Sequence, residues 1–523
     1  MRSISILDCT LRDGGYINSW RFGKSAISEI VSLLEESGVE TIECGFIEDA
    51  PQDPDVSVYR NADMIDSFTK KAGTRYVAMI ALGDIDAEKV TPRRPEGIDG
   101  IRLTFHKHEL EEEMRQARIL MDKGYDVYVQ PVGTSTYTDR ELIDLIDRVN
   151  ALHPYAFYIV DTLGVMYPND VRRIFSIIDS NLDPETVVGF HSHNNLQLSF
   201  SNAQTIMSVS EKRDLIIDSS VFGMGRGAGN LTTELITQYI NNTYGHKYNI
   251  LPLLSVMERY LNDIYLKTPW GYSSPYYLSA VNKCHPNYAN YLMLKRTLGA
   301  ESISKILSLI PPESRGLYDK KLIEHLYYSF QSSKIDDSEA VSEIGRILHG
   351  RKILVLASGD SVKTYRKQIS DWITANDAFV IHINTVKEGY PANMLFISNA
   401  LRAESLPADS LNGIKIVATS NFRLKDDSVL RVDYPSLLNE SSEPDNAGLM
   451  LLSLLVKVGV KHAALAGFDG FGGGSEDYVG FVSRSYMQRD AGEMNDQISH
   501  VLQHLSQSMD MEFVTPTMYA LQG

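Results

Sequence analysis

The chain has 523 residues, which is too long for a single hydrophobic core, so two or three domains are expected. Apolar residues make up 43% of the sequence and charged residues 22%, which is typical of a soluble globular protein. The net charge of −17 argues against a nucleic acid or an anionic membrane surface as partner, because either would require a basic patch.

Cysteine usage indicates a reducing compartment. The chain contains only Cys9, Cys44 and Cys284, an odd and sparse set that provides no disulfide framework. No apolar run has the length of a membrane span, and the amino terminus lacks a signal-peptide pattern. We therefore expect a cytoplasmic protein without a membrane span.

Residues 1–245 alternate short apolar runs with amphipathic helical stretches such as Lys24–Ser37. Eight strands alternating with helices over about 250 residues predict a (β/α)₈ TIM barrel. An open doubly wound sheet is the alternative. The predicted strands are Ile4–Leu7, Thr41–Gly45, Tyr76–Ala81, Gly100–Thr104, Val127–Pro131, Ala156–Asp161, Val187–His191 and Leu215–Val221.

The barrel prediction says where functional residues should lie, because in this fold they gather at the carboxyl ends of the strands. Polar residues are common at strand ends in any barrel. The informative point is that several of these residues form one set that could bind a metal ion. The candidates within or after the predicted strands are Arg12, Asp13, Glu43, Arg102, Thr162, His191, His193, Arg226 and Asn230.

A metal site is the most specific hypothesis among these candidates. His191 and His193 stand two residues apart after the apolar run 187–190, so both imidazoles leave one face of a strand and can share a metal ion. Asp13 follows the first predicted strand and could complete a facial set. Each motif also has an interpretation without a function. The histidines would then be polar residues at a strand end, and Arg12 and Asp13 would form a surface ion pair.

Residues 246–345 are mostly helical and are predicted as an extension packed on the barrel. Alternatively, His285 and Tyr288 reach over the barrel mouth. Residues 346–523 return to an α/β pattern and predict a Rossmann-like domain. Its predicted strands are Lys352–Ala357, Ala378–Asn384, Asn393–Ser398, Ile414–Ala418 and His462–Ala466.

Four ordered motifs carry a family resemblance over roughly residues 1–300. They are Leu11–Gly14, Glu43 within Ile42–Gly45, His191–Leu196 and Gly223–Asn230. Together they resemble the DRE-TIM metallolyase superfamily, and the last two are most similar to the 4-hydroxy-2-oxovalerate aldolases.

The resemblance implies that Asp13, His191 and His193 hold a divalent metal ion, with Asn230 as a further ligand or as a neighbour of the ligands. Two imidazoles, a carboxylate and open water positions suit Mn²⁺ or Mg²⁺, with Zn²⁺ and Co²⁺ as alternatives. A 2-oxo acid such as pyruvate would bind there, and the chemistry would be aldol or Claisen chemistry through an enolate.

Within that resemblance, Arg12 would lie beside the substrate carbonyl, and Glu43 would hold Arg12 or a ligand in place. We expect Arg102, Thr162 and Arg226 to contact the substrate.

The sequence departs from the aldolases at Tyr16, where they carry a histidine proposed as the acid/base. A phenol with a pKa of about 10 is a poor base at neutral pH, so Tyr16 donates a hydrogen bond or a proton, or the base lies elsewhere. The other candidates are a metal-bound water, His106, His108 and His285. The loop 223–230 lacks the cysteine of the hydroxymethylglutaryl-CoA lyases, which argues against that activity.

The last domain loosely resembles bacterial sialyltransferase-like and DUF115-type domains, although Ala357 and Asp360 depart from their pattern. A turn with Ser358, Gly359 and Ser361 after a strand can bind phosphate through backbone N–H groups, and many such turns bind nothing. The candidate ligand-binding residues of this domain are Ser358, Gly359, Ser361 and Asp469.

The sequence therefore predicts a metal-dependent aldolase, a C–C lyase acting on a 2-oxo acid. A nucleotide-linked or phosphorylated sugar bound by the last domain would suit cell-surface glycan biosynthesis, and we expect a homo-oligomer. The alternatives are a Claisen-type acyl-CoA synthase and a non-catalytic binding or regulatory protein.

Overall fold

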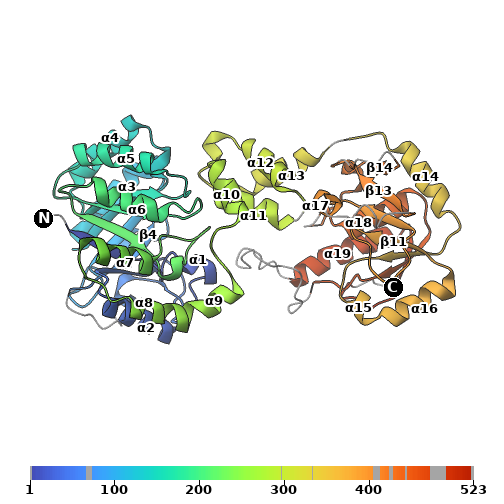
Figure 1. The fold of residues 1–523 in the computed structure, drawn as a ribbon, viewed down its shortest axis with the longest axis horizontal. Coiled ribbons are helices and arrows are strands. Elements are labelled where there is room, and N and C mark those ends of the chain that lie inside the picture. The colour runs from blue at the N-terminus through green and yellow to red at the C-terminus, as the bar shows by residue number, and fades with distance from the viewer. Residues whose placement is uncertain are drawn as a thin grey trace. The chain divides into compact units, whose positions relative to one another are not determined.

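The computed structural model in Figure 1 describes residues 3–65, 73–295, 297–332, 334–404, 413–422, 424, 428–441, 444–471 and 491–519. These residues form two compact units. The first contains the described residues up to 290 and residues 311–318, and the second contains the described residues of 291–310 and those from 319 onward.

The first unit is a closed (β/α)₈ barrel, as predicted. Every neighbouring pair of its strands is parallel, and β1 pairs with both β9 and β2, which closes the sheet and excludes the open alternative. A short strand, β3 (Val58–Tyr59), adds to β2. The barrel strands are β1 (Ile4–Asp8), β2 (Thr41–Ile47), β4 (Arg75–Ala81), β5 (Gly100–Phe105), β6 (Asp126–Pro131), β7 (Ala156–Asp161), β8 (Val187–Ser192) and β9 (Leu215–Ser219).

The helices between these strands bury one apolar face each. In α4, for example, Leu142, Leu145 and Val149 recur at helical spacing and are buried, and Thr138 caps the helix by accepting a hydrogen bond from the Glu141 N–H. The helices of this part are α1 (Gly15–Asn18), α2 (Lys24–Ser37), α3 (Leu110–Asp122), α4 (Asp139–Leu152), α5 (Pro168–Asn181), α6 (Ser199–Val209) and α7 (Thr233–Tyr244).

The interior of the barrel has an apolar part of its own. Leu7, Val77, Tyr128 and Tyr158 form a buried cluster separate from the larger core. These side chains come from four different strands, as the two-residue alternation of a barrel strand requires. Apolar packing therefore fills part of the interior and leaves polar residues to the strand ends.

The predicted helical segment contains seven helices, and they divide between the two units. Trp270 fastens this segment to the barrel, because its Nε1–H donates to the Phe222 carbonyl at 3.0 Å and its ring packs against the Phe222 ring at 5.2 Å. The helices are α8 (Leu251–Val256), α9 (Asn262–Lys267), α10 (Ser274–Val281), α11 (Pro286–Lys295), α12 (Ala300–Ser308), α13 (Lys320–Gln331) and α14 (Ser338–Leu348).

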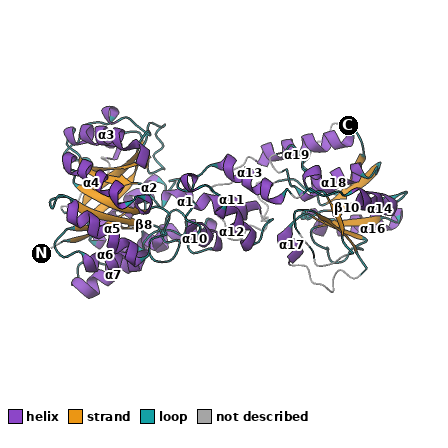
Figure 2. Ribbon diagram, turned by 90° about the horizontal axis from the view of Figure 1, so that it is seen from above, coloured by secondary structure: helices purple, strands orange, loops and turns teal. Residues whose placement is uncertain are grey.

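The second unit holds a seven-stranded, entirely parallel sheet in the order β14-β13-β12-β11-β10-β15-β16. Separate apolar clusters cover its two faces, and Figure 2 shows helices around the strands. The strands are β10 (Ile353–Leu356), β11 (Phe379–Ile383), β12 (Met394–Ile397), β13 (Lys415–Thr419), β14 (Leu430–Val432), β15 (His462–Ala466) and β16 (Asp510–Phe513). The helices are α15 (Ser361–Thr364), α16 (Arg366–Asn376), α17 (Ala400–Glu404), α18 (Ala447–Lys457) and α19 (Ala491–Ser506).

Five strands of this sheet were predicted, and the edge strands β14 and β16 were not. Both are short and half exposed, so neither carries the continuous apolar run by which buried parallel strands are detected. Within the described part of the chain, no helix has the length and apolar character needed to cross a membrane.

Candidate metal centre

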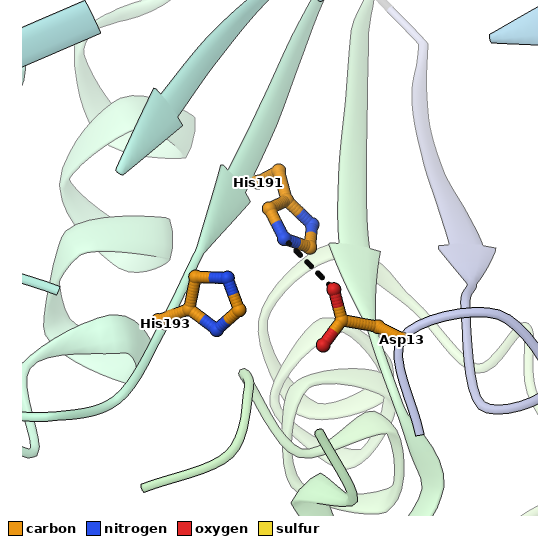
Figure 3. A group of neighbouring side chains, drawn as sticks. All are labelled: Asp13, His191 and His193. Carbon is orange, nitrogen blue, oxygen red and sulfur yellow. Dashed lines mark ion pairs between the residues drawn. The ribbon is translucent and has the colours of Figure 1, made fainter. Parts of the chain in front are cut away.

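Asp13, His191 and His193 meet at the carboxyl ends of the barrel strands (Figure 3). Each offers one ligand atom, and these atoms all lie within 4.8 Å of one another. The Nε2 atom of His191 lies 3.6 Å from the Asp13 Oδ2 atom. The three side chains retain only 1%, 4% and 7% exposure, respectively. The structure thus brings together three residues that the sequence placed on two separate strand ends.

Local backbone structure explains how Asp13 reaches the histidines. Beyond β1 the chain turns tightly, and the N–H groups of Arg12 and Asp13 both donate to the Cys9 carbonyl. A side chain at Gly14 would place its Cβ 2.2 Å from the Thr10 carbonyl oxygen, so the turn requires glycine there. Since β1 pairs with β9 and β9 with β8, only one strand separates this turn from the strand that carries the histidines.

Asn230 lies beside these three residues and is a candidate for a further ligand. It forms a backbone bridge with His193, and its Oδ1 atom is buried without a hydrogen-bond partner among the described residues. A Cβ at Gly225 would lie 2.3 Å from the Asn230 Nδ2 atom and 2.8 Å from the Asp13 Oδ1 atom. A buried, unpaired amide oxygen is costly unless something binds it, so this donor set fits a metal ion.

The protonation states also suit a metal. Burial lowers the pKa of His193 to about 3, which keeps its imidazole neutral. Burial alone would raise the pKa of Asp13, but the charges of Arg12, His193 and His191 hold it well below its usual range. Neutral imidazole and ionised carboxylate are the forms in which these side chains bind metals.

Asp218 on β9 is a site residue that the sequence reasoning missed. Its Oδ2 atom lies 3.0 Å from the His191 Nδ1 atom, which fixes the ring and leaves Nε2 directed toward Asp13. Burial opposes ionisation of Asp218, but Arg102 and His191 lower its pKa. A carboxylate inside the apolar run 215–219 was the available signal, because such a residue must find a buried partner.

Arg12, Glu43 and Arg102 continue this network into the barrel. Arg12 Nε lies 2.8 Å from Glu43 Oε2, and its NH1 group lies 2.5 Å from Asp13 Oδ2. Arg102 pairs with both Glu43, at 2.7 Å, and Asp218. Arg102 is fully buried, so its placement favours a role in positioning these carboxylates over the direct substrate contact we expected.

The barrel is similar in sequence to known metal-dependent lyases. The family model described as HMGL-like matches residues 103–257. A 4-hydroxy-2-oxovalerate aldolase of Geobacillus genomosp. 3 is 26% identical over 244 residues, which is 46% of this chain and 71% of that protein. The aldolase of the same name from Thermomicrobium roseum is 28% identical over 258 residues, 48% of this chain and 69% of its own.

The family model and these relatives support the assignment of the barrel to the DRE-TIM superfamily. An oxaloacetate decarboxylase of Mycobacterium tuberculosis is also 28% identical over 239 residues, covering 44% of this chain and 68% of that protein. Among solved structures, the N-terminal domain of a proposed aldolase from Bacteroides vulgatus is 24% identical, with a TM-score of 0.49 over 58% of this chain and 99% of that one.

Other predicted residues lie around the candidate metal centre at the mouth of the barrel. The Arg226 N–H donates to Asp13 Oδ1 at 3.1 Å, and its guanidinium lies 5.6 Å from the centre of the Tyr16 ring. The Arg226 Nε atom is buried and has no hydrogen-bond partner in the described part of the chain. Thr162 lies after β7, where its hydroxyl accepts the Gly133 N–H at 2.9 Å.

Asn195, which follows the histidines, holds the glycine-rich loop against its neighbours. Its side chain accepts the Ala228 N–H and donates to the Leu163 carbonyl, both at 2.9 Å. Gly227 has a φ of +70°, and a Cβ there would lie 2.7 Å from the Asn195 Oδ1 atom. The family motif therefore has a structural role besides its histidines.

In the second unit, the candidate turn after β10 already holds a carboxylate. Asp469 Oδ2 accepts the Ser361 N–H at 2.8 Å, and its Oδ1 accepts the Ser361 hydroxyl. A Cβ at Gly359 would lie 2.4 Å from the Asp469 Cγ atom, while Ser358 is exposed. A phosphate would have to displace this carboxylate from Ser361, so binding at the turn stays a prediction.

Proposed function

We propose that this chain is a divalent-metal-dependent aldolase that forms or cleaves a C–C bond through the enolate of a 2-oxo acid such as pyruvate. The observation that carries the proposal is the convergence of Asp13, His191 and His193 with the unpaired Asn230 Oδ1 atom, beside the guanidinium of Arg12. When bound, a divalent ion would supply Lewis-acid stabilisation of the negative charge that develops on the substrate oxygen.

Arg12 would add a second positive charge at the same place. Burial opposes its ionisation, but Glu43 and Asp13 raise its pKa, so the guanidinium stays charged. Glu43 binds Arg12 through Nε, and Arg102 holds Glu43 from its other side. A fixed, buried cation of this kind stabilises a developing enolate without reorganisation during the reaction.

The chain's similarity to both aldolases and an oxaloacetate decarboxylase supports enolate chemistry in general, because decarboxylation of oxaloacetate and cleavage of a hydroxy-oxo acid release the same pyruvate enolate. The glycine-rich loop places the unpaired Arg226 Nε at the mouth, where it would bind an anionic group of the second substrate. An acyl-CoA synthase would use the same ligands and would release CoA thiol.

On this proposal the second unit binds a phosphorylated or nucleotide-linked sugar, and the coupled reaction serves cell-surface glycan biosynthesis. What supports the binding site is its position: Gly359 and Asp469 lie at the carboxyl ends of β10 and β15, adjacent strands between which the strand order reverses.

Two measurements test the proposed function. The first is the metal content of the wild type and of His191→Ala after dialysis against Mn²⁺, Mg²⁺, Co²⁺ or Zn²⁺, with the exposed His108→Ala as control. The second is exchange of pyruvate methyl protons with deuterium, which needs no second substrate. We expect exchange that requires added metal, Asp13 and Arg12. Equal metal content in wild type and His191→Ala would refute the site.

A further inference from the structure

Arg226 brings a positive charge to the candidate metal centre without a carboxylate to balance it. Arg12 and Arg102 each pair with two carboxylates at this centre. Arg226 is half-buried, forms no ion pair with any described residue, and has a buried Nε–H without a hydrogen-bond partner among them. A half-buried charge without a partner is unfavourable, so this guanidinium is available to an anionic group of a substrate.

Backbone contacts fix Arg226 close to the metal ligands. Its N–H donates to Asp13 Oδ1 at 3.1 Å, and a Cβ on the preceding residue, Gly225, would lie 2.8 Å from the same oxygen. The loop that carries Arg226 follows β9, and β9 pairs with β1, whose turn carries Asp13. Because the side chain starts from this contact, its covalent length keeps the guanidinium near the centre.

The ring of Tyr16 shows where the guanidinium of Arg226 lies. The Arg226 Cζ atom is 5.6 Å from the centre of this ring. Tyr16 belongs to the same tight turn as Asp13, since its N–H donates to the Asp13 carbonyl at 3.2 Å. A guanidinium is attracted to the face of an aromatic ring. Tyr16 therefore holds the charge of Arg226 beside the turn that carries the metal ligand.

Two other aromatic rings hold Tyr16 in place. The Tyr16 ring lies 4.9 Å from that of Trp20 and 6.2 Å from that of Phe46, and the latter two lie 5.6 Å apart, all edge to face. The Trp20 Nε1–H donates to the Arg12 carbonyl at 2.8 Å, and a Cβ at Gly15 would lie 1.9 Å from Trp20 Cδ1. The aromatic cluster of Tyr16, Trp20 and Phe46 thus fixes the ring on which the guanidinium of Arg226 packs.

We propose that the aldehyde attacked by the enolate carries a phosphate or carboxylate group, that Arg226 binds this group, and that Tyr16 is a positioning residue for the Arg226 guanidinium. The inference rests on the proposed aldolase function and names the class of its second substrate. It gives Tyr16 a role that needs no proton transfer, because the face of its ring acts on the guanidinium.

The anionic group takes no part in the bond changes. In the condensation direction, the enolate carbon forms a bond to the aldehyde carbon, and the π electrons of the aldehyde carbonyl move onto its oxygen, which takes a proton from solvent. The phosphate or carboxylate keeps all its bonds. Arg226 therefore binds it equally before and during C–C bond formation, and the contact acts mainly on the KM of the aldehyde.

The test compares charged and neutral aldehydes of similar size within each variant. Pyruvate is condensed with glyceraldehyde 3-phosphate or glyceraldehyde, and with succinic semialdehyde or butanal. The ratio of kcat/KM for the charged over the neutral aldehyde is insensitive to a general loss of activity. The variants are Arg226→Gln, Arg226→Lys, Tyr16→Leu and Tyr16→Phe. Arg118→Gln is the control, because Arg118 is exposed on α3, where it donates to the Ala151 carbonyl. Thermal melting checks folding, and deuterium exchange into pyruvate alone reports enolate formation.

We expect wild type and Arg118→Gln to prefer a charged aldehyde over its neutral counterpart by about 10²-fold in kcat/KM, mainly through KM, which is the usual effect of a hydrogen bond between charged groups. The pair that shows the preference identifies the anion as phosphate or carboxylate. Arg226→Gln should abolish the preference, and Arg226→Lys should keep part of it. Tyr16→Leu should lower it by about tenfold, whereas Tyr16→Phe keeps the ring and should retain it.

A wild type that exchanges deuterium but shows no preference, or condenses with none of the aldehydes, would overturn the inference. So would equal losses with charged and neutral aldehydes in Arg226→Gln, which would place Arg226 on the carboxylate of pyruvate instead. A Tyr16→Leu variant that keeps the preference or loses activity with both kinds of aldehyde, or a Tyr16→Phe variant that loses the preference, would overturn the positioning role of Tyr16. A wild type without metal-dependent exchange would instead refute the proposed function itself, and the inference with it.

Discussion

Replacing Asp218 by asparagine tests whether a buried carboxylate orients the metal ligand His191. In the wild type, Asp218 Oδ2 accepts from His191 Nδ1 at 3.0 Å and pairs with Arg102, and neither Arg102 nor Asp218 has an exposed side chain. Asparagine keeps the shape but removes the charge. His191 and Arg102 both donate to the same oxygen, Oδ2, so an amide oxygen in that position can still accept both hydrogen bonds, and the substitution mainly removes the negative charge.

The size of the effect follows from these contacts. Loss of the carboxylate that orients a metal-binding histidine weakens metal affinity by about 10–100-fold, or about 1.4–2.8 kcal/mol. Stability should also fall, because Arg102 keeps only Glu43 as a buried counter-charge. Removing one partner of a buried ion pair lowers the free energy of unfolding by about 3–5 kcal/mol. We expect a loss near the lower end of this range, because Arg102 still pairs with Glu43.

Mn²⁺ affinity by competition with a fluorescent chelator, and urea unfolding of the metal-free protein, measure the two effects. Asp179→Asn is the matched control, because it also removes a carboxylate paired with a buried arginine, Arg213, but on a helix rather than at the metal centre. An Asp218→Asn variant that is less stable but binds Mn²⁺ as tightly as wild type would refute the orienting role.

Three further predictions concern the same end of the barrel. Gly225→Ala should reduce metal content to that of Asp13→Ala without unfolding the barrel, because its Cβ would lie 2.3 Å from Asn230 Nδ2 and 2.8 Å from Asp13 Oδ1; full metal content would contradict the placement. Burial raises the pKa of Asp8 to about 6 from 3.8, so its contribution to stability is present below pH 4 and is lost as pH rises through 6. Urea titrations should therefore show Asp8→Asn gaining about 2–3 kcal/mol relative to wild type between pH 4 and pH 7, whereas a constant difference would argue against the raised pKa. Arg12→Lys should retain metal but lower pyruvate exchange by about 10²-fold, since an ammonium cannot span both carboxylate partners of the guanidinium; exchange at the wild-type rate would exclude the proposed charge stabilisation.

Much of the site follows from the sequence because barrel topology converts positions along the chain into positions in space. Once eight strands are counted, the residues after each strand must gather at one end of the barrel. His191 and His193 then share a face through the two-residue period of β8, and Asp13 reaches them from the end of β1, on the other side of β9. The meeting of these three side chains could therefore be predicted before any contact was known.

Other roles could not be predicted, because they depend on which side chains meet across the barrel. The buried ion pairs of Arg102 with Glu43 and Asp218 could not be predicted, and its contact with substrate stays a prediction. The hydrogen bond from the Ser361 N–H to Asp469, 108 residues away, could not be predicted either, and phosphate binding at that turn stays a prediction.

The sequence by itself thus predicted the eight-stranded barrel from periodicity and strand order, and its motifs resembled the DRE-TIM superfamily; it also predicted that Asp13, His191 and His193 come together. Only the tertiary structure decided that Asp218 lies beside His191 and that Arg102 lies between Glu43 and Asp218. Both arrangements depend on strand register around the closed barrel, which brings together side chains whose separation along the chain carries no periodic signal.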